Sequence, residues 1–101
     1  MDIWEFQRRF PDLHNFVGGY FPDADLEGLS DTEAAEQFAL LDSDSDLRRQ
    51  VLEQGEVVLA LEPFPLEALS NLANRHLTSS DEARGWLSSM LLTVRRASGG
   101  R

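Results

Sequence analysis

Apolar residues recur at intervals of three and four along most of the chain, which is the spacing that places side chains on one face of a helix. The first such stretch covers residues 3–17 and is interrupted at Pro11, because proline lacks the amide hydrogen that a helix interior needs. Since proline suits the first position of a helix, the pattern predicts a short helix over residues 11–17. Gly18 and Gly19 are expected to end it.

Two capping boxes mark the beginnings of two further helices. Ser30 and Glu33 have the spacing at which a serine oxygen and a glutamate carboxylate each satisfy a free amide, so a helix is expected from Asp31. Ser79 and Glu82 repeat this spacing ahead of the clearest apolar stripe in the chain. The last helix is therefore predicted to run from this box to the paired arginines near the C-terminus, whose charge complements the helix dipole.

The apolar spacing also predicts a helix over residues 45–61, which the prolines that follow must end because the residue before a proline is pushed out of helical geometry. Within it, Gly55 is either a point of close packing against a neighbouring helix or a local weakness. A further helix is expected to open at Pro65. Residues 20–29, by contrast, contain proline, glycine and alternating acids and are predicted to form a loop.

No stretch shows the apolar and polar alternation of a strand, and no Asn-Gly or Asp-Gly hairpin turn occurs. The fold class predicted from the sequence is therefore all-α, a compact bundle of about five helices. A chain of 101 residues is long enough for one core and too short for two. Residues 1–97 are accordingly assigned to a single helical domain, and residues 98–101 to a disordered tail.

The net charge of −9 is concentrated in one part of the chain, because residues 23–46 contain nine acidic residues and no basic one. Such a field repels nucleic acid phosphates and attracts basic proteins, whose association it accelerates. A solvated face that keeps the protein soluble explains the same charge, so charge alone leaves both interpretations open. The nine residues are Asp23, Asp25, Glu27, Asp31, Glu33, Glu36, Asp42, Asp44 and Asp46.

Composition narrows the class of protein further. Cysteine is absent, which excludes disulfides, thiolate metal sites and cysteine nucleophiles. The longest apolar run, residues 57–61, is far shorter than the roughly 20 residues that cross a bilayer. The first residues carry an acid where a secretory signal carries positive charge, and no apolar signal region follows. We therefore expect a cytoplasmic protein with no membrane partner.

The sequence contains no motif of a catalytic site: a nucleophile elbow, a glycine-rich phosphate loop and a zinc-binding His-Glu-x-x-His motif are all missing. His14 and His76 lie in different predicted helices, with no clear ligand three or four residues away. Asp23, Asp25 and Glu27 are close enough in sequence for acid–base chemistry, but the loop offers no apolar cleft that would tune a carboxyl group for it. We expect neither an enzyme nor a bound cofactor or metal.

Residues 42–53 resemble a calcium-binding loop of the EF-hand type, with acids at loop positions one, three, five and twelve. The sixth position, where such a loop needs glycine, is Leu47, and two arginines follow it. Because Leu47 also fits the apolar stripe, the stretch is better explained as a cap that leads into a helix. A calcium-responsive module stays a minor alternative.

Residues 10–28 carry the most specific pattern in the chain. The run Phe10-Pro11-Asp12-Leu13-His14-Asn15-Phe16-Val17-Gly18-Gly19-Tyr20-Phe21, followed by Asp23, Asp25-Leu26-Glu27 and Gly28, resembles the CdiI-type immunity proteins of bacterial contact-dependent growth inhibition systems. Those proteins open with a similar proline-led helix, a Gly-Gly-Tyr-Phe turn and an acidic loop. The likeness extends more loosely to about residue 95, and the chain departs from it at Ala24, where many members have an aromatic residue.

This resemblance implies a non-enzymatic protein that binds the C-terminal domain of a polymorphic toxin in the cytoplasm and neutralises it. Such toxins are often nucleases with basic substrate surfaces, which agrees with the acidic segment; no direct binding of nucleic acid is expected. Tyr20 is either a lid on the core or an interface anchor. The candidate partner-binding residues are Tyr20, Asp23, Asp25, Glu27, Asp42, Asp44 and Asp46.

The charge argument fits another class of protein as well. A small acidic adaptor or inhibitor domain, with a basic partner unrelated to any toxin, would carry the same segment. The adjacent upstream gene distinguishes the two classes, since a large exported protein with a variable C-terminus favours an immunity protein.

Overall fold

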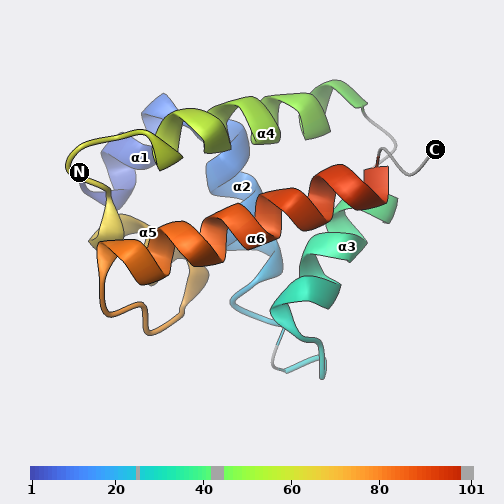
Figure 1. Cartoon of the computed structure of the whole chain (residues 1–101). Helices are drawn as coiled ribbons and strands as arrows, with labels where there is room; N and C mark the ends of the chain where they lie inside the picture. Colours follow the sequence, from blue (N-terminus) through green and yellow to red (C-terminus); the bar gives the residue numbers. More distant parts are fainter. Residues whose placement is uncertain (25, 42–44, 99–101) are drawn as a thin grey trace.

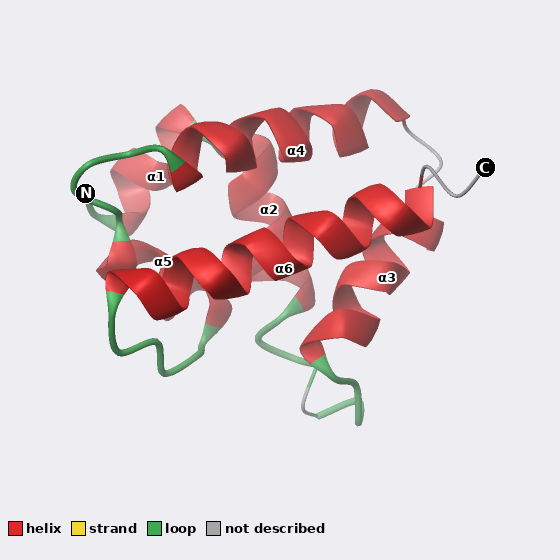
Figure 2. Ribbon diagram, viewed as in Figure 1, coloured by secondary structure: helices red, strands yellow, loops and turns green. Residues whose placement is uncertain are grey.

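The computed structural model describes residues 1–24, 26–41 and 45–98, and the elements found there are six α-helices without a strand. Figure 2 shows helices and loops, and no strand, in this part of the chain. The all-α prediction is confirmed, with one helix more than expected. The helices are α1 (Ile3–Arg9), α2 (Pro11–Tyr20), α3 (Asp31–Leu41), α4 (Ser45–Leu59), α5 (Leu66–Ala73) and α6 (Ser80–Ser98).

The additional helix is α1, which the sequence pattern did not separate from the apolar stretch around Pro11. Its first turn is capped by Asp2, whose carboxylate accepts a hydrogen bond of 2.8 Å from the Glu5 amide. Phe10 ends α1 and directly precedes α2. Pro11 occupies the first position of α2, where the missing amide hydrogen would have had no partner within the helix.

The prediction that Gly18 and Gly19 end α2 is wrong, because the helix continues to Tyr20. Gly18 allows close packing instead, since a Cβ atom there would lie 2.8 Å from Leu72 Cδ1 on α5. The glycine with a left-handed backbone in this region is Gly28, at φ 73°. The turn toward α3 therefore needs its glycine ten residues later than the sequence pattern indicated.

The first capping box forms as predicted, and the second forms with one of its two bonds displaced. The Glu33 amide donates to Ser30 Oγ at 3.1 Å, and the Ser30 amide donates to the Glu33 carboxylate at 2.9 Å. At the second box the Glu82 amide donates to Ser79 Oγ at 3.1 Å. The Glu82 carboxylate accepts from the amide and hydroxyl of Thr78, at 2.8 and 2.7 Å, so the return bond is displaced by one residue. These two hydrogen bonds lower the pKa of Glu82, since they favour its ionised form.

The long α6 crosses the molecule and packs mainly against α3 and α4, as Figure 1 shows. Beneath it, α2 contacts α1, α3, α4 and α5 and thus lies at the centre of the fold. Most of the buried residues of α3 are alanines, which allows a close approach to α6. The largest fully buried side chains are Phe6, Phe16, Phe21, Leu13, Leu69, Leu87, Leu91, Val17, Val51, Val58 and Val94.

Of the two roles considered for Gly55, close packing and local weakness, the structure supports close packing. A Cβ atom there would lie 2.8 Å from Leu91 Cδ2 and nearer still to Cδ1, so α4 can approach α6 only through a glycine. The helix α4 ends at Leu59, two residues earlier than predicted, and α5 begins directly after Pro65. None of the helices in the described ranges is long and apolar enough to cross a membrane. The predicted tail, residues 98–101, lies outside the described residues apart from Ser98, where α6 ends.

Candidate partner-binding surface

The connection between α2 and α3, residues 21–30, is a compact turn that packs onto the core. The Ala24 amide donates to the Phe21 carbonyl at 3.2 Å, and the Leu29 amide donates to the Ala24 carbonyl at 2.8 Å. Ala24 is fully buried, and Leu29 packs against the core cluster. The backbone that carries the first acids of the acidic segment is therefore held by its own hydrogen bonds and by apolar contacts.

Tyr20 covers one end of the aromatic part of the core. Its half-buried ring lies 5.4 Å from the Phe38 ring in an edge-to-face arrangement and 6.3 Å from the Phe16 ring. Such pairs contribute about 1 kcal/mol each beyond the area that they bury. Of the two roles considered for Tyr20, these contacts support the lid.

Of the candidate acids that the structure describes, Asp23 and Glu27 precede α3 and Asp46 lies beyond its other end (Figure 1). Asp23 and Glu27 are exposed on the connection that leads into α3, next to Tyr20. Asp46 is exposed in the first turn of α4, beyond the other end of α3, and pairs with Arg49 at 3.3 Å. An 11-residue helix is about 16 Å long, so the two groups are well separated. Asp25, Asp42 and Asp44 lie outside the described residues.

The outward side of α3 carries further acids between the two groups. Glu33, Glu36 and Leu40 are exposed, and their spacing of three and four places them on one side of the helix. Ala35 and Phe38 are buried on the opposite side. We call the exposed acidic and leucine residues of the connection and of this side of α3 the acidic face; its described members are Asp23, Leu26, Glu27, Glu33, Glu36 and Leu40.

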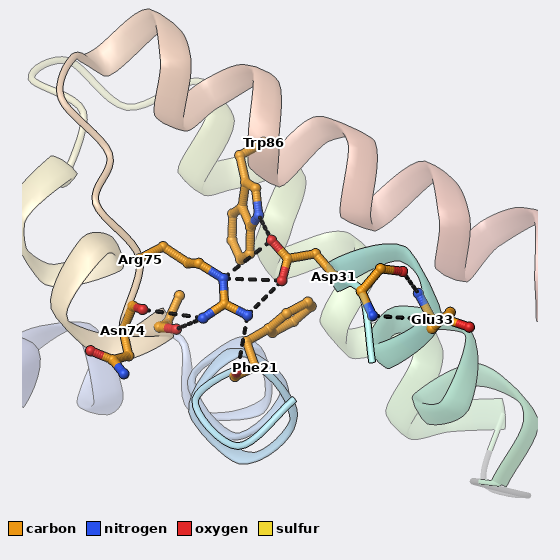
Figure 3. Close-up of polar contacts among 8 residues, drawn as sticks. Phe21, Asp31, Glu33, Asn74, Arg75 and Trp86 are labelled. Atoms are coloured by element: carbon orange, nitrogen blue, oxygen red, sulfur yellow. Dashed lines mark hydrogen bonds and ion pairs between the residues drawn. The ribbon is translucent and has the colours of Figure 1, made fainter. Parts of the chain in front are cut away.

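Asp31, at the beginning of α3, has a structural role that the sequence analysis missed (Figure 3). Arg75 donates from Nε to both carboxylate oxygens, at 3.0 and 3.3 Å, and from Nη2 to Oδ1 at 2.6 Å. Trp86 on α6 donates from its indole nitrogen to Oδ2 at 2.8 Å. One of the nine acids is therefore neutralised within the molecule.

Arg75 also binds the backbone around it. Its Nη2 donates to the Phe21 carbonyl at 3.0 Å, and its Nη1 donates to the carbonyls of Ala73 and Asn74, at 3.3 and 3.1 Å. The rings of Phe21 and Trp86 meet edge to face at 5.0 Å. This cluster thus joins the end of α2, the beginning of α3, the end of α5 and the first half of α6, as Figure 3 shows.

The cluster changes the acidity of Asp31. Partial burial by itself would raise its pKa, but the hydrogen bonds from Arg75 and Trp86 and the charge of Arg75 outweigh this and lower it. No short-range spacing in the sequence predicts this cluster, because Arg75 and Trp86 are 44 and 55 residues away from Asp31 in the chain. The one available signal was the tryptophan itself, since an indole N–H on an apolar helix face needs an acceptor.

The calcium alternative is contradicted by the position of α4. The helix begins at Ser45, so residues 45–53 are helical and cannot wrap around an ion as the second part of an EF-hand loop does. No group of three or more possible metal ligands was found among the described residues. A surface hollow of about 500 Å³ lies along α5, and no residue of the acidic face lines it, whereas a hollow of about 350 Å³ between α3 and α6 is lined by Glu36 and Arg96.

No protein-family model matches this chain, and no curated protein and no solved structure shows significant similarity to it. The class of protein that the fold and the surface define is a small all-α protein with an acidic face built around α3. Its particular function is inferred from that face and from the residue pattern over positions 10–28.

Proposed function

We propose that this chain is a non-enzymatic immunity protein that binds and neutralises the C-terminal toxin domain of a contact-dependent growth inhibition system or a related polymorphic toxin. The observation that carries the proposal is the acidic face, whose members include no basic residue; at its edge, Arg96 of α6 lines a surface hollow of about 350 Å³ together with Glu36. The residue pattern over positions 10–28 supports the immunity class, and a nuclease toxin supplies the basic surface that such a face attracts. The cytoplasm is the compartment in which this partner would be met.

Within the described part of the chain the acids of this face have no ion pair, a property that they share with Glu67 on α5 but not with several other acids. Asp23, Glu27 and Glu36 are exposed and form no ion pair within the described part of the chain. Elsewhere, arginines lie within 4 Å of the carboxylates in the pairs Glu5–Arg9, Glu56–Arg95 and Glu62–Arg84. Like charges without counterions repel one another and weaken the folded state, so a basic partner that approaches the acidic face relieves an unfavourable interaction.

Electrostatic complementarity of this kind mainly accelerates encounter. The acids would steer a basic toxin domain toward α3, while contacts that lose their water on binding would determine how long the complex lasts. Because the Arg75 cluster and the internal hydrogen bonds hold the connection, little conformational entropy would be lost when the partner binds.

The test measures association with the toxin domain encoded by the neighbouring gene, purified as a catalytically inactive variant. Replacing both Asp23 and Glu27 by lysine should slow association about tenfold at low salt and flatten its salt dependence. The matched control replaces Glu67 and Asp81 by lysine, which changes the net charge equally on α5 and α6. Control kinetics within about twofold of wild type are expected.

Two results would contradict the proposal. If wild-type protein and toxin domain do not associate at micromolar concentration, the partner is not this toxin. If both pairs of substitutions slow association equally, only net charge matters, and the acidic face has no special part in binding.

A further inference from the structure

Two leucines stand out on the acidic face by their exposure. The large apolar side chains that are exposed in the described part of the chain are Met1 (39%), Trp4 (76%), Leu26 (86%), Leu40 (70%), Val57 (51%) and Leu92 (42%). The two most exposed aliphatic ones, Leu26 and Leu40, both lie within residues 23–46, which contain no basic residue. They lie near opposite ends of α3 as two separate exposed side chains, and each has an exposed acid close by, Glu27 beside Leu26 and Glu36 one turn before Leu40.

Leu26 is exposed because its neighbours occupy the inward positions of the connection. Ala24 is buried and Leu29 packs against the core, while hydrogen bonds hold the backbone on either side. Arg75 secures both ends of the connection through the Phe21 carbonyl and the Asp31 carboxylate. The Leu26 side chain therefore remains 86% exposed, and its burial by a partner would stabilise a complex.

Leu40 belongs to the helix α3. It lies one turn beyond Glu36 on the outward side of α3, while Phe38 and Ala39 beside it are buried. A leucine on a formed helix has few conformations to lose when a partner covers it. Both leucines thus have the properties of interface anchors, with acids in the surrounding rim.

We infer that Leu26 and Leu40 are the apolar anchors of the acidic face, and that each is received by an apolar hollow bordered by lysine or arginine on a protein partner. This inference rests on the proposed function and specifies its partner surface. The stems of lysine and arginine pack along leucine while their charged ends reach Glu27 or Glu36. Nucleic acid and an anionic membrane would be repelled by the same acids, and a second copy of the chain would oppose two faces that lack cations.

The experiment compares the variants Leu26→Gln and Leu40→Gln with the control Val57→Gln on α4, using the inactive toxin domain as the probe. Glutamine is polar, uncharged and compatible with a helix, so the fold and the charge are preserved. Each leucine variant should raise the dissociation rate at least tenfold and leave the association rate and its salt dependence unchanged. Val57→Gln should stay within twofold of wild type.

The possible failures are distinguishable. If wild type binds, charge reversal slows association and both leucine variants dissociate like wild type, the inference is wrong and the proposed function stands. If wild type does not bind the toxin domain, the proposed function fails and the inference fails with it. If sedimentation shows a wild-type dimer that Leu26→Gln or Leu40→Gln converts to monomer, the leucines serve self-association and the inference is overturned.

Discussion

Arg75 and Asp31 form an ion pair in which the shortest nitrogen–oxygen distance is 2.6 Å, although 44 residues separate them in the chain. Both side chains are largely buried, with 16% and 26% of their surfaces exposed. The pair joins the loop before α6 to the first residue of α3. The acidic face is therefore attached to the core of the molecule at the point where α3 begins.

Replacing Arg75 by alanine should destabilise the protein by about 2 kcal/mol, because the partly buried Asp31 carboxylate loses its counterion and three of its hydrogen bonds and is left with the Trp86 bond. Urea denaturation measures this free energy of unfolding. The control is Arg49→Ala, whose pairs with Asp46 and Glu53 are exposed and should contribute less than about 0.5 kcal/mol. If both variants lost the same free energy of unfolding, the buried ion pair would stabilise the protein no more than the exposed pairs do.

The contribution of Asp31 should depend on pH. Its pKa is lowered in the folded state, so its stabilisation is complete above the unfolded value of about 3.9 and is lost as the pH falls through the lower folded value. The difference in unfolding free energy between wild type and Asp31→Asn should therefore shrink between about pH 5 and pH 2. Urea titrations at several pH values check this. If the difference between wild type and Asp31→Asn stayed constant between these pH values, the Asp31–Arg75 ion pair would not be its source.

The beginning of α2 is capped from another helix. Gln54 on α4 accepts hydrogen bonds from the amides of Asp12 and Leu13, both at 3.0 Å, and donates to the Asp12 carboxylate at 3.0 Å. Phe10, the residue at the cap position, supplies no side-chain bond. Gln54→Ala should thus reduce stability by about 1 kcal/mol, the usual effect of losing a cap.

The control for this prediction is Gln50→Ala, one turn earlier on α4. Its effect on thermal or urea denaturation should lie within about 0.5 kcal/mol of zero, as for most surface substitutions. If Gln54→Ala were equally neutral, water would replace the cap without loss, and the contact between α2 and α4 would depend on apolar packing alone.

Two glycines within helices should respond to alanine in opposite ways. At Gly55 the added methyl group would overlap Leu91, which is 2% exposed and has little room to move, so a loss of about 1–3 kcal/mol is expected. At Gly85 on α6 no atom lies within 4 Å of the added carbon, and alanine should stabilise the helix by about 1 kcal/mol. Urea denaturation of both variants tests these two predictions. If Gly55→Ala raised the free energy of unfolding, α4 and α6 would separate easily.

Features that depend on neighbours three or four residues apart were predictable. The all-α class, the start of α3 at the Ser30–Glu33 box and the start of α6 near Ser79 follow from local hydrogen bonds and apolar spacing. The predicted end of α2 was wrong. Gly18 packs closely against Leu72 of α5, and such a long-range contact cannot be predicted from neighbours three or four residues away. The separate α1 was missed because Phe10 both ends one helix and precedes the next.

The sequence by itself determined the amount of negative charge between residues 23 and 46 and the absence of cations among it. Only the tertiary structure decided how that charge is distributed: Asp31 is neutralised by Arg75, and the length of α3 separates Asp23 and Glu27 from Asp46. The physical reason is that composition sums charges along a chain, whereas an electrostatic surface depends on which charges the fold pairs, exposes or moves apart.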